Sequence, residues 1–201
     1  MATTTALFVI DIQMDLAKCP ETQIPHSAQI VEAGNKILST ARTILDAERG
    51  KAETLPAIIV FVQHEEQPEK GPLVRGSDPW KFVFDPRTGV EEERLVAKST
   101  RDTFESNPAL ASELKRMGIR EIIAFGIQSE CCVESTCSGA LVAGFEVTLL
   151  SGAHSTYNAG DKRAIDIEDE VEGRLREKGA KIVPWEEAVT SWKREGRLSC
   201  R

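Results

Sequence analysis

Cysteine and histidine are scarce in this sequence, and both are arranged in ways that exclude common site types. The five cysteines are odd in number and two of them are neighbours, which argues against a framework of disulfides. The three histidines stand singly, and there is no CxxC pair. We therefore expect free thiols in a reducing compartment and no cysteine-rich metal cluster.

A basic segment, a long apolar run and a nucleotide-binding motif are also missing. The net charge of −7 is spread along the chain, which argues against nucleic acid as a partner. Near the N-terminus, Asp11 interrupts the apolar run too early for a signal peptide or a membrane span. No GxGxxG motif or phosphate-binding loop follows an apolar run. The sequence predicts a cytoplasmic protein without a membrane partner or a nucleotide cofactor.

Six short apolar runs, rich in β-branched residues, predict the strands of a buried sheet. Their hydrophobicity is continuous rather than alternating, as in strands that are covered on both faces. The runs occupy residues 7–12, 57–63, 94–99, 121–127, 145–151 and 180–185. Segments with helical periodicity occupy residues 27–50, 108–118, 131–143 and 161–179. The pattern predicts one α/β domain over residues 1–201, a Rossmann-like three-layer sandwich with a six-stranded, mostly parallel sheet and helices on both faces.

Two segments do not fit this alternation. Residues 64–93 are too rich in proline, glycine and charge to form a crossover helix. A loop of this length is typically functional or mobile. The last nine residues, "KREGRLSCR", fit either a loose tail or an arm.

Reactive side chains stand at the ends of three predicted strands, at one edge of the sheet, where open α/β sheets bind their ligands. Asp11 ends the first run, Lys98 the third, and the pair Cys131 and Cys132 follows the fourth. Singly, each has an ordinary explanation as a turn former, a solvated lysine or a small buried group. Together with a helix N-terminus they supply what a cysteine nucleophile needs: a proton acceptor, a positive charge and donors for an oxyanion.

The segments around these residues resemble the isochorismatase-like cysteine hydrolases, which include nicotinamidases and N-carbamoylsarcosine amidase. "FVIDIQ" (8–13) is similar to the segment with the catalytic aspartate, "VAKSTRDTF" (96–104) to the lysine segment, and "GIQSECCVEST" (126–136) to the cysteine segment. In that family the nucleophile directly precedes a valine and lies four residues before a threonine. The resemblance therefore selects Cys132 over Cys131, and it extends over residues 6–158.

This resemblance implies a mechanism. Asp11 is implied as the general base, Lys98 as the stabilising charge, and Cys132 as the nucleophile that forms a thioester. A cis peptide bond is implied between Ile127 and Gln128, and an oxyanion hole is implied from the backbone N–H groups of Gln128 and Cys132.

The two adjacent cysteines are expected to differ in their surroundings. In the first turn of a helix, the dipole and Lys98 are expected to hold Cys132 as a thiolate. Neighbouring residues on a helix point about 100° apart. Cys131, like Cys137, is therefore expected to pack away from the pocket.

Two departures from the family narrow the expected chemistry. Nicotinamidases hold a metal near the second strand through an Asp/His cluster, whereas "FVQHEEQ" (61–67) offers only His64 and two glutamates. We therefore expect no metal and no other cofactor. Isochorismatase proper has no cysteine at the nucleophile position, so ether hydrolysis is not expected. The loop "GPLVRGSDPW" (71–80) resembles that of metal-free members acting on other amides, streptothricin hydrolase among them.

Several further residues are candidates for contact with a substrate. Gln13, Trp80, Phe104 and Tyr157 are the principal ones, although Gln13 equally suits a turn cap and aromatic side chains are usually core. His154 either reaches the pocket or binds a backbone carbonyl. Arg101 and Asp102 are expected to pair with each other or with a neighbouring subunit.

The sequence thus predicts a cofactor-free cysteine hydrolase that cleaves a C–N bond in a small amide-type substrate. The resemblance also implies a homo-oligomer, either a dimer or a tetramer. An alternative from another class is a catalytically silent or redox-sensing thiol protein on the same fold. Asp11 and Lys98 discriminate between the two, because redox sensing needs neither residue.

Overall fold

A six-stranded parallel sheet forms the centre of the molecule in the computed structural model, which describes residues 4–50 and 57–200. The strand order is β3-β2-β1-β4-β5-β6, and each of the five pairings is parallel. The strands are β1 (Thr4–Ile10), β2 (Ala57–His64), β3 (Glu93–Lys98), β4 (Ile119–Ile127), β5 (Glu146–Ser155) and β6 (Lys181–Pro184). The predicted α/β sandwich is confirmed.

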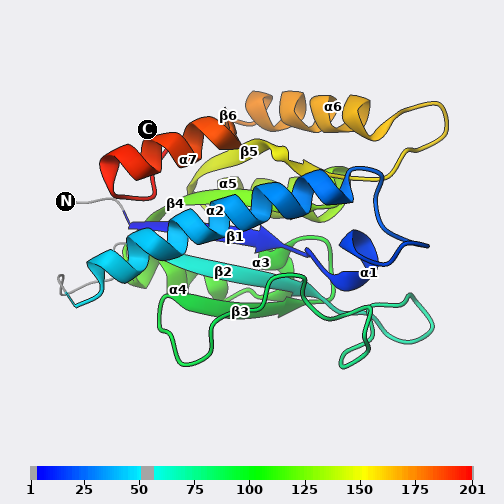
Figure 1. Ribbon diagram of the computed structural model, residues 1–201, viewed down its shortest axis with the longest axis horizontal. Coiled ribbons are helices and arrows are strands. Elements are labelled where there is room, and N and C mark those ends of the chain that lie inside the picture. The colour runs from blue at the N-terminus through cyan, green and yellow to red at the C-terminus, as the bar shows by residue number, and fades with distance from the viewer. Residues whose placement is uncertain (1–3, 51–56, 201) are drawn as a thin grey trace.

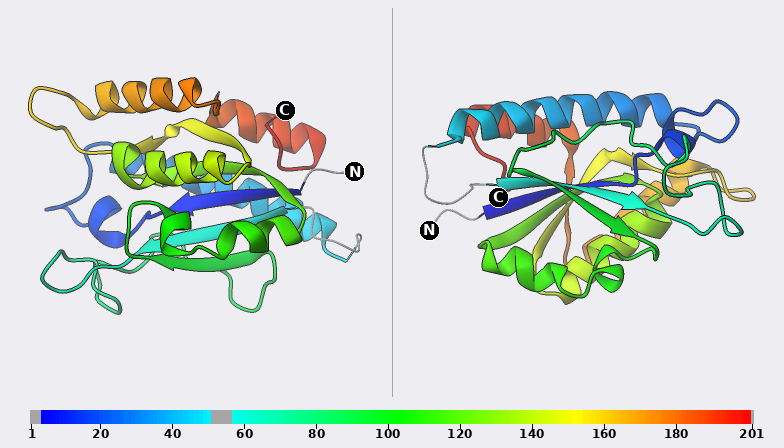
Figure 2. Two further views of the ribbon diagram at one scale, coloured as in Figure 1. Left: turned by 180° about the vertical axis from the view of Figure 1, so that it is seen from behind. Right: turned by 90° about the horizontal axis from the view of Figure 1, so that it is seen from below.

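Helices cover both faces of the sheet (Figures 1 and 2). One face packs against α2 (Ser27–Glu48) and α7 (Trp185–Glu195), and the other against α4 (Leu110–Arg116), α5 (Glu134–Val142) and α6 (Ala164–Glu177). The short helices α1 (Met14–Ala17) and α3 (Thr103–Ser106) follow β1 and β3, and a π-helical turn, η1 (Ser129–Val133), joins β4 to α5. Among the described residues, no helix has the length and apolar character needed to cross a membrane.

Successive residues of the central strands pack into two separate cores. Leu7 and Val9 of β1 belong to the core under α2 and α7, whereas Phe8 and Ile10 belong to the core under α4, α5 and α6. Side chains alternate between the two faces of a strand, so a sheet covered on both sides needs a continuous apolar run. This requirement explains why the strands could be recognised in the sequence.

The C-terminal segment is an ordered part of the fold rather than a loose tail. Helix α7 occupies residues that we had left between the sixth strand and a tail, and the indole of its buried Trp192 donates to the carbonyl of Ser199 at 3.1 Å. The hydroxyl of Thr5 donates to the carbonyl of Leu198 at 2.9 Å, and the N–H of Cys200 donates to the carboxylate of Glu121 at 3.2 Å. These contacts form a clasp at the amino ends of β1 and β4.

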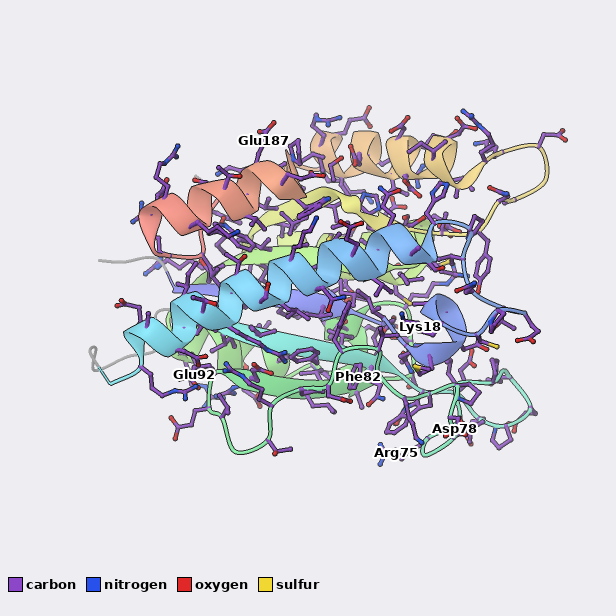
Figure 3. All side chains as sticks on the ribbon, viewed as in Figure 1. Lys18, Arg75, Asp78, Phe82, Glu92 and Glu187 are labelled. Carbon is purple, nitrogen blue, oxygen red and sulfur yellow. The ribbon has the colours of Figure 1, made fainter. Side chains whose placement is uncertain are left out.

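The long loop between β2 and β3 is fastened to the carboxyl edge of the sheet. The N–H of Met14 donates to the carbonyl of Lys81 at 2.8 Å. Arg75 pairs with Glu65 at 2.8 Å, and Figure 3 shows Arg75 and Asp78 at the outer side of this loop. The loop therefore lies where it can form a wall of a site at that edge.

Candidate active site

Asp11 lies directly beyond the end of β1. Its backbone has a left-handed conformation (φ 49°), which outside glycine is tolerated best by asparagine and aspartate. The N–H of Asp11 still donates to the carbonyl of Val62 in β2 at 3.1 Å. Its side chain is only 1% exposed, so the carboxylate is held away from solvent at the carboxyl edge of the sheet.

Lys98, the last residue of β3, joins Asp11 to the nucleophile candidate. Its Nζ lies 2.7 Å from Oδ2 of Asp11 and 3.1 Å from Sγ of Cys132, and it also donates to the carbonyl of Thr100 at 3.1 Å. Burial alone would lower the pKa of Lys98, but Asp11 and Cys132 raise it above its ordinary value. Lys98 is therefore a buried ammonium ion.

Cys132 sits in the π-helical turn η1. The N–H groups of Cys131 and Val133 both donate to the carbonyl of Gln128, at 3.2 and 3.1 Å. The peptide bond between Ile127 and Gln128 is cis, as the resemblance implied. We expected an ordinary helix start here, and the structure instead has a π turn, a feature that is frequent at functional sites.

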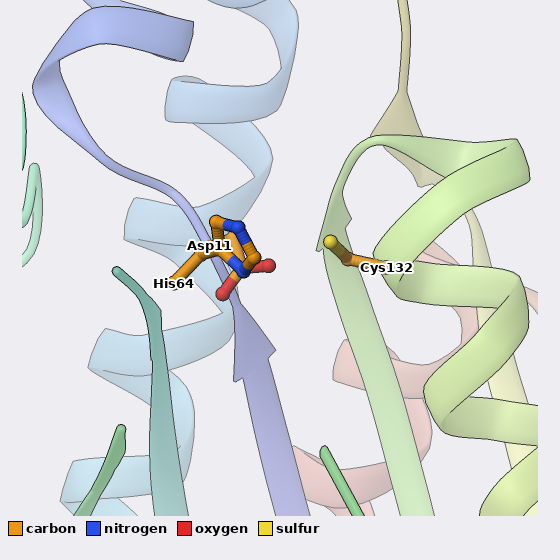
Figure 4. Close-up of side chains that lie close together, drawn as sticks. All are labelled: Asp11, His64 and Cys132. Atoms are coloured by element: carbon orange, nitrogen blue, oxygen red, sulfur yellow. The ribbon is translucent and has the colours of Figure 1, made fainter. Parts of the chain in front are cut away.

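A cavity of about 260 Å³ opens above these groups. Its walls come from α1, the end of β2, the following loop, the segment after β3 and the turn after β4. The lining residues are Asp11, Asp15, Leu16, His64, Glu66, Pro72, Leu73, Arg101, Ile127, Gln128, Cys131 and Cys132. Figure 4 shows Asp11 and His64 at the ends of their strands, with Cys132 facing them from the turn after β4. The structure thus brings Asp11, Lys98 and Cys132 together at one small cavity.

Most of the chain matches a known family. The family model described as the isochorismatase domain matches residues 5–185. The chain belongs to the isochorismatase family. Among curated proteins, this family member is 28% identical to streptothricin hydrolase of Streptomyces noursei over 176 residues. The match covers 87% of the chain but 57% of that relative, so the chain spans little more than half of the relative's length.

Solved structures of the isochorismatase family share its fold. An isochorismatase-like hydrolase from Alkaliphilus metalliredigens superposes with a TM-score of 0.75 at 21% identity, covering 94% of this chain and 99% of that one. The pyrazinamidase of Pyrococcus horikoshii in complex with zinc superposes with a TM-score of 0.63 at 25% identity, covering 90% and 98%. The predicted family is confirmed, and the names of these relatives agree with the predicted class of hydrolases.

The protonation state of Cys132 differs from our expectation for an isochorismatase-family nucleophile. Burial, followed by the negative charge of Asp11, raises the pKa of Cys132, and Lys98 only partly opposes this. Burial and Asp11 thus favour the thiol of Cys132 over the thiolate that we expected. The Oδ1 atom of Asp11 is buried without a hydrogen-bond partner among the described residues, which leaves it free to accept the thiol proton.

Cys131 also differs from its expected placement. It lines the cavity, whereas we expected it to pack away. Cys131 and Cys132 both lie on the cavity wall, so an angle of about 100° between neighbouring side chains does not remove Cys131 from it. Burial and then Glu130 raise the pKa of Cys131. Cys137 is buried in the core, as expected.

None of the four residues expected to contact substrate lines the cavity in the part of the chain that the structure describes. Gln13 is fully buried, and its amide donates to the carbonyls of His64 and Trp80 at 3.0 and 2.8 Å and accepts from the N–H of His64 at 2.9 Å. Gln13 thus joins the end of β2 to the carbonyl of Trp80 in the loop. We assign it a positioning role.

The two other aromatic candidates are engaged elsewhere in the protein. Phe104 stacks on Phe8 with ring centroids 6.0 Å apart, in the core under α5. The hydroxyl of Tyr157 donates to the carbonyl of Thr22. Both positions follow strands of the sheet, but their side chains turn into packing rather than into the cavity.

Residues 101 and 102 also take separate roles. Asp102 caps α3, accepting the N–H of Phe104 at 2.8 Å, and Arg101 lines the cavity. The Asp102 carboxylate therefore binds the backbone of α3, and not Arg101 as we expected. Arg101 instead brings a positive charge to the cavity wall.

His154 supports the turn that carries Cys132. Its Nδ1 lies 2.8 Å from Oγ of Ser129, the first residue of η1, and its Nε2 lies 3.3 Å from the carboxylate of Glu172 in α6. Ser129 and His154 are almost fully buried. His154 thus neither lines the cavity nor binds a backbone carbonyl, and it ties η1 to a helix on the face of the sheet.

His64 is the residue whose importance the sequence did not reveal. Its Nδ1 lies 3.1 Å from Nζ of Lys98. Burial, followed by the charge of Lys98, lowers the pKa of His64. The imidazole is therefore neutral at neutral pH, with Nδ1 accepting from Lys98 and the proton on Nε2. His64 and Lys98 are paired in register across β2 and β3, a relationship that depends on the strand order.

Asp11, His64 and Cys132 have the chemistry of a metal-ligand set, with donor atoms within 4.8 Å of one another. However, the ammonium of Lys98 contacts all three, at 2.7, 3.1 and 3.1 Å. It holds the place that a cation would take between them. A divalent ion next to a buried ammonium would be strongly repelled. These residues therefore do not fit a metal ion.

Proposed function

We propose that this isochorismatase-family protein is a cysteine hydrolase that cleaves the C–N bond of a small amide-type substrate. The observation that carries the proposal is the contact of Lys98 with both Asp11 and Cys132, at 2.7 and 3.1 Å, beside a cavity of about 260 Å³. A nucleophile, a base and a fixed positive charge within contact distance form the minimum set for acyl transfer.

The reaction begins with a proton transfer inside this cluster. Asp11 accepts the proton of the Cys132 thiol, and the thiolate attacks the carbonyl carbon of the bound amide. Lys98 stabilises the negative charge on sulfur, while the backbone N–H groups of Gln128 and Cys132 are proposed to stabilise the oxyanion. Protonated Asp11 then gives its proton to the leaving nitrogen, which departs as ammonia or an amine and leaves a thioester on Cys132.

Water completes the cycle. Asp11, again a carboxylate, removes a proton from the attacking water, and the acid product leaves as the Cys132 thiol is restored. No redox partner enters these steps. The raised pKa of Cys132 agrees with this scheme, because the first step starts from the thiol.

The redox-sensing alternative has less support from the site. Sensor cysteines are accessible thiols with a lowered pKa. In contrast, burial raises the pKa of both Cys131 and Cys132. A sensor also has no use for the buried pair of Asp11 and Lys98.

The proposal is tested by screening primary amides, lactams, ureas and carbamoyl compounds for release of ammonia or amine. For each active compound, acid quenching followed by peptide mapping should place an acyl adduct on Cys132. Cys132→Ala should lose both adduct and turnover, and Cys131→Ala should retain both. An adduct on Cys131, or turnover by Cys132→Ala, would contradict the proposal.

A further inference from the structure

His64 and Glu66 lie next to each other on the cavity wall, at the end of β2 and the start of the loop that follows. Their facing atoms, Nε2 of His64 and Oε1 of Glu66, are 3.9 Å apart. This separation is too long for a hydrogen bond. The two atoms are thus close enough to contact one ligand and too far apart to satisfy each other.

Three contacts fix the orientation of His64. Its Nδ1 contacts Lys98 at 3.1 Å, and the amide of Gln13 holds both its backbone N–H and its carbonyl, at 2.9 and 3.0 Å. Because Nδ1 accepts from an ammonium ion, the single proton of the neutral ring is on Nε2. His64 therefore presents a fixed N–H donor on the cavity wall.

Glu66 is fixed in a different way. Its Oε2 accepts the N–H of Leu73 at 3.1 Å, and its own N–H donates to the carbonyl of Leu73 at 2.9 Å. A Cβ atom on Gly71 would lie 2.1 Å from Oε2, so the carboxylate occupies space that only a glycine leaves free. With Oε2 engaged, Oε1 is the oxygen that faces His64 and remains available as an acceptor.

We propose that His64 and Glu66 act as a donor–acceptor pair that binds a substrate carbonyl group together with an N–H on the same carbonyl carbon. His64 donates to the oxygen and Glu66 accepts from the nitrogen of an edge that is separate from the carbonyl attacked by Cys132, so the preferred substrates carry a primary amide, ureido or lactam edge next to the bond that is cleaved. This inference rests on the proposed function, because it places that edge beside Cys132. A compound that offers the carbonyl without the N–H leaves Glu66 without a partner in a partly buried site, which weakens its binding.

The proposal can be tested without a known substrate by measuring the alkylation of Cys132. The two probes are iodoacetamide, which has both a carbonyl and N–H groups, and N,N-dimethyliodoacetamide, which has the carbonyl alone. His64, Glu66 and Cys132 line the same cavity, so an amide one carbon from the reacting sulfur lies in the cavity that the pair faces. Second-order rate constants are measured at pH 9 by mass spectrometry with peptide mapping, and each is divided by the value for glutathione.

The ratio of the rate constant for iodoacetamide to that for the dimethyl probe should be about 10-fold larger for the wild-type protein than for glutathione. This is the factor expected for one partly buried hydrogen bond. Glu66→Gln keeps the shape and an oxygen for Leu73 but turns the acceptor into a donor, so it should abolish this preference. A preference caused by the size of the methyl groups would survive Glu66→Gln. His64→Asn keeps an oxygen near Lys98 but removes the Nε2 donor, so it should slow both probes.

The possible failures are distinguishable. A wild-type preference equal to that of glutathione, or one that survives Glu66→Gln, overturns the donor–acceptor pair and leaves the hydrolase proposal in place. Alkylation that maps to Cys131, with Cys132 unmodified, overturns both proposals. Comparison of probe ratios within each variant removes any change in the thiolate fraction that the variant itself causes.

Discussion

Nζ of Lys98 lies 2.7 Å from Oδ2 of Asp11, and both side chains are shielded from solvent. Removing one partner of a buried ion pair leaves an uncompensated charge, which typically costs about 3 to 5 kcal/mol. We therefore expect Asp11→Asn and Lys98→Met each to lower the free energy of unfolding by about that amount. The double variant should lose less than the sum, because it leaves no unpaired charge. Urea denaturation of the wild type, the two single variants and the double variant measures this coupling. Losses of stability that simply add would contradict an ion pair between Asp11 and Lys98.

The same two residues should act in opposite directions on the reactivity of Cys132. Only the thiolate is alkylated, so a raised pKa makes the reaction slow at neutral pH and causes its rate to keep rising above pH 9. Asp11→Asn removes a charge that raises this pKa, so alkylation should become faster at a given pH. Lys98→Met removes a charge that lowers it, so alkylation should become slower. Both changes are tested by measuring the rate of alkylation by iodoacetamide between pH 6 and pH 10, which is about the range in which thiols titrate.

Hydrolysis should respond differently from alkylation in Asp11→Asn. This variant removes the base, so kcat should fall by about 100-fold or more on any substrate that the amide screen identifies. Faster alkylation together with slower hydrolysis would separate the role of Asp11 as a base from its effect on the thiol. A parallel fall of both rates would show that the variant has lost its site, and circular dichroism provides the control for folding.

Substitution of Lys98 should also change the affinity for metal ions. In the wild-type protein the ammonium contacts Asp11, His64 and Cys132, so turnover should survive dialysis against EDTA. Lys98→Ala removes that ammonium and leaves carboxylate, imidazole and thiol ligands close together, a set that suits Zn²⁺. Mass spectrometry of dialysed samples should find about one zinc ion on Lys98→Ala and none on the wild type. Stoichiometric zinc on the wild type would contradict our assignment of Lys98.

His154 should affect the rate more than the affinity. It holds Ser129 at 2.8 Å and thereby the turn that carries Cys132. We expect His154→Ala to lower kcat by about 10-fold with little change in KM, because misplacing a reacting group slows chemistry more than binding. His154→Asn, which keeps an acceptor near Nδ1, should recover part of the loss. His26→Ala is the matched control, since His26 contacts Glu168 at 3.4 Å and not Ser129.

The elements that could be predicted from the sequence are those that depend on local pattern. Continuous apolar runs identified the strands, and the meeting of strand ends at one edge brought Asp11, Lys98 and Cys132 together. Helix α7 was missed although its buried residues recur at helical spacing, because we placed residue 185 in the sixth strand and the residues from 193 onward in a tail or an arm. The role of His64 was missed for a different reason, since its neighbour Lys98 follows from the order of β2 and β3.

The protonation state of Cys132 illustrates a second limit of the sequence. A helix end and a lysine are visible in the sequence, and both favour the thiolate. Burial acts against them, and Cys132 packs against a core built from segments far away along the chain, including Phe8 and Val60. Desolvation is thus a property of the assembled fold, and residue patterns near the cysteine carry no information about it.

The clasp formed by Thr5, Glu121, Leu198 and Cys200 lies at the amino ends of β1 and β4, whereas Asp11 and Cys132 follow their carboxyl ends. The two strands thus have one end that secures the fold and another that bears the reactive groups. Thermal tolerance and substrate choice are therefore separable targets for engineering. A library confined to the clasp can be selected for heat resistance with the reactive edge left intact, and one confined to the cavity wall can be selected for new substrates in the stabilised background.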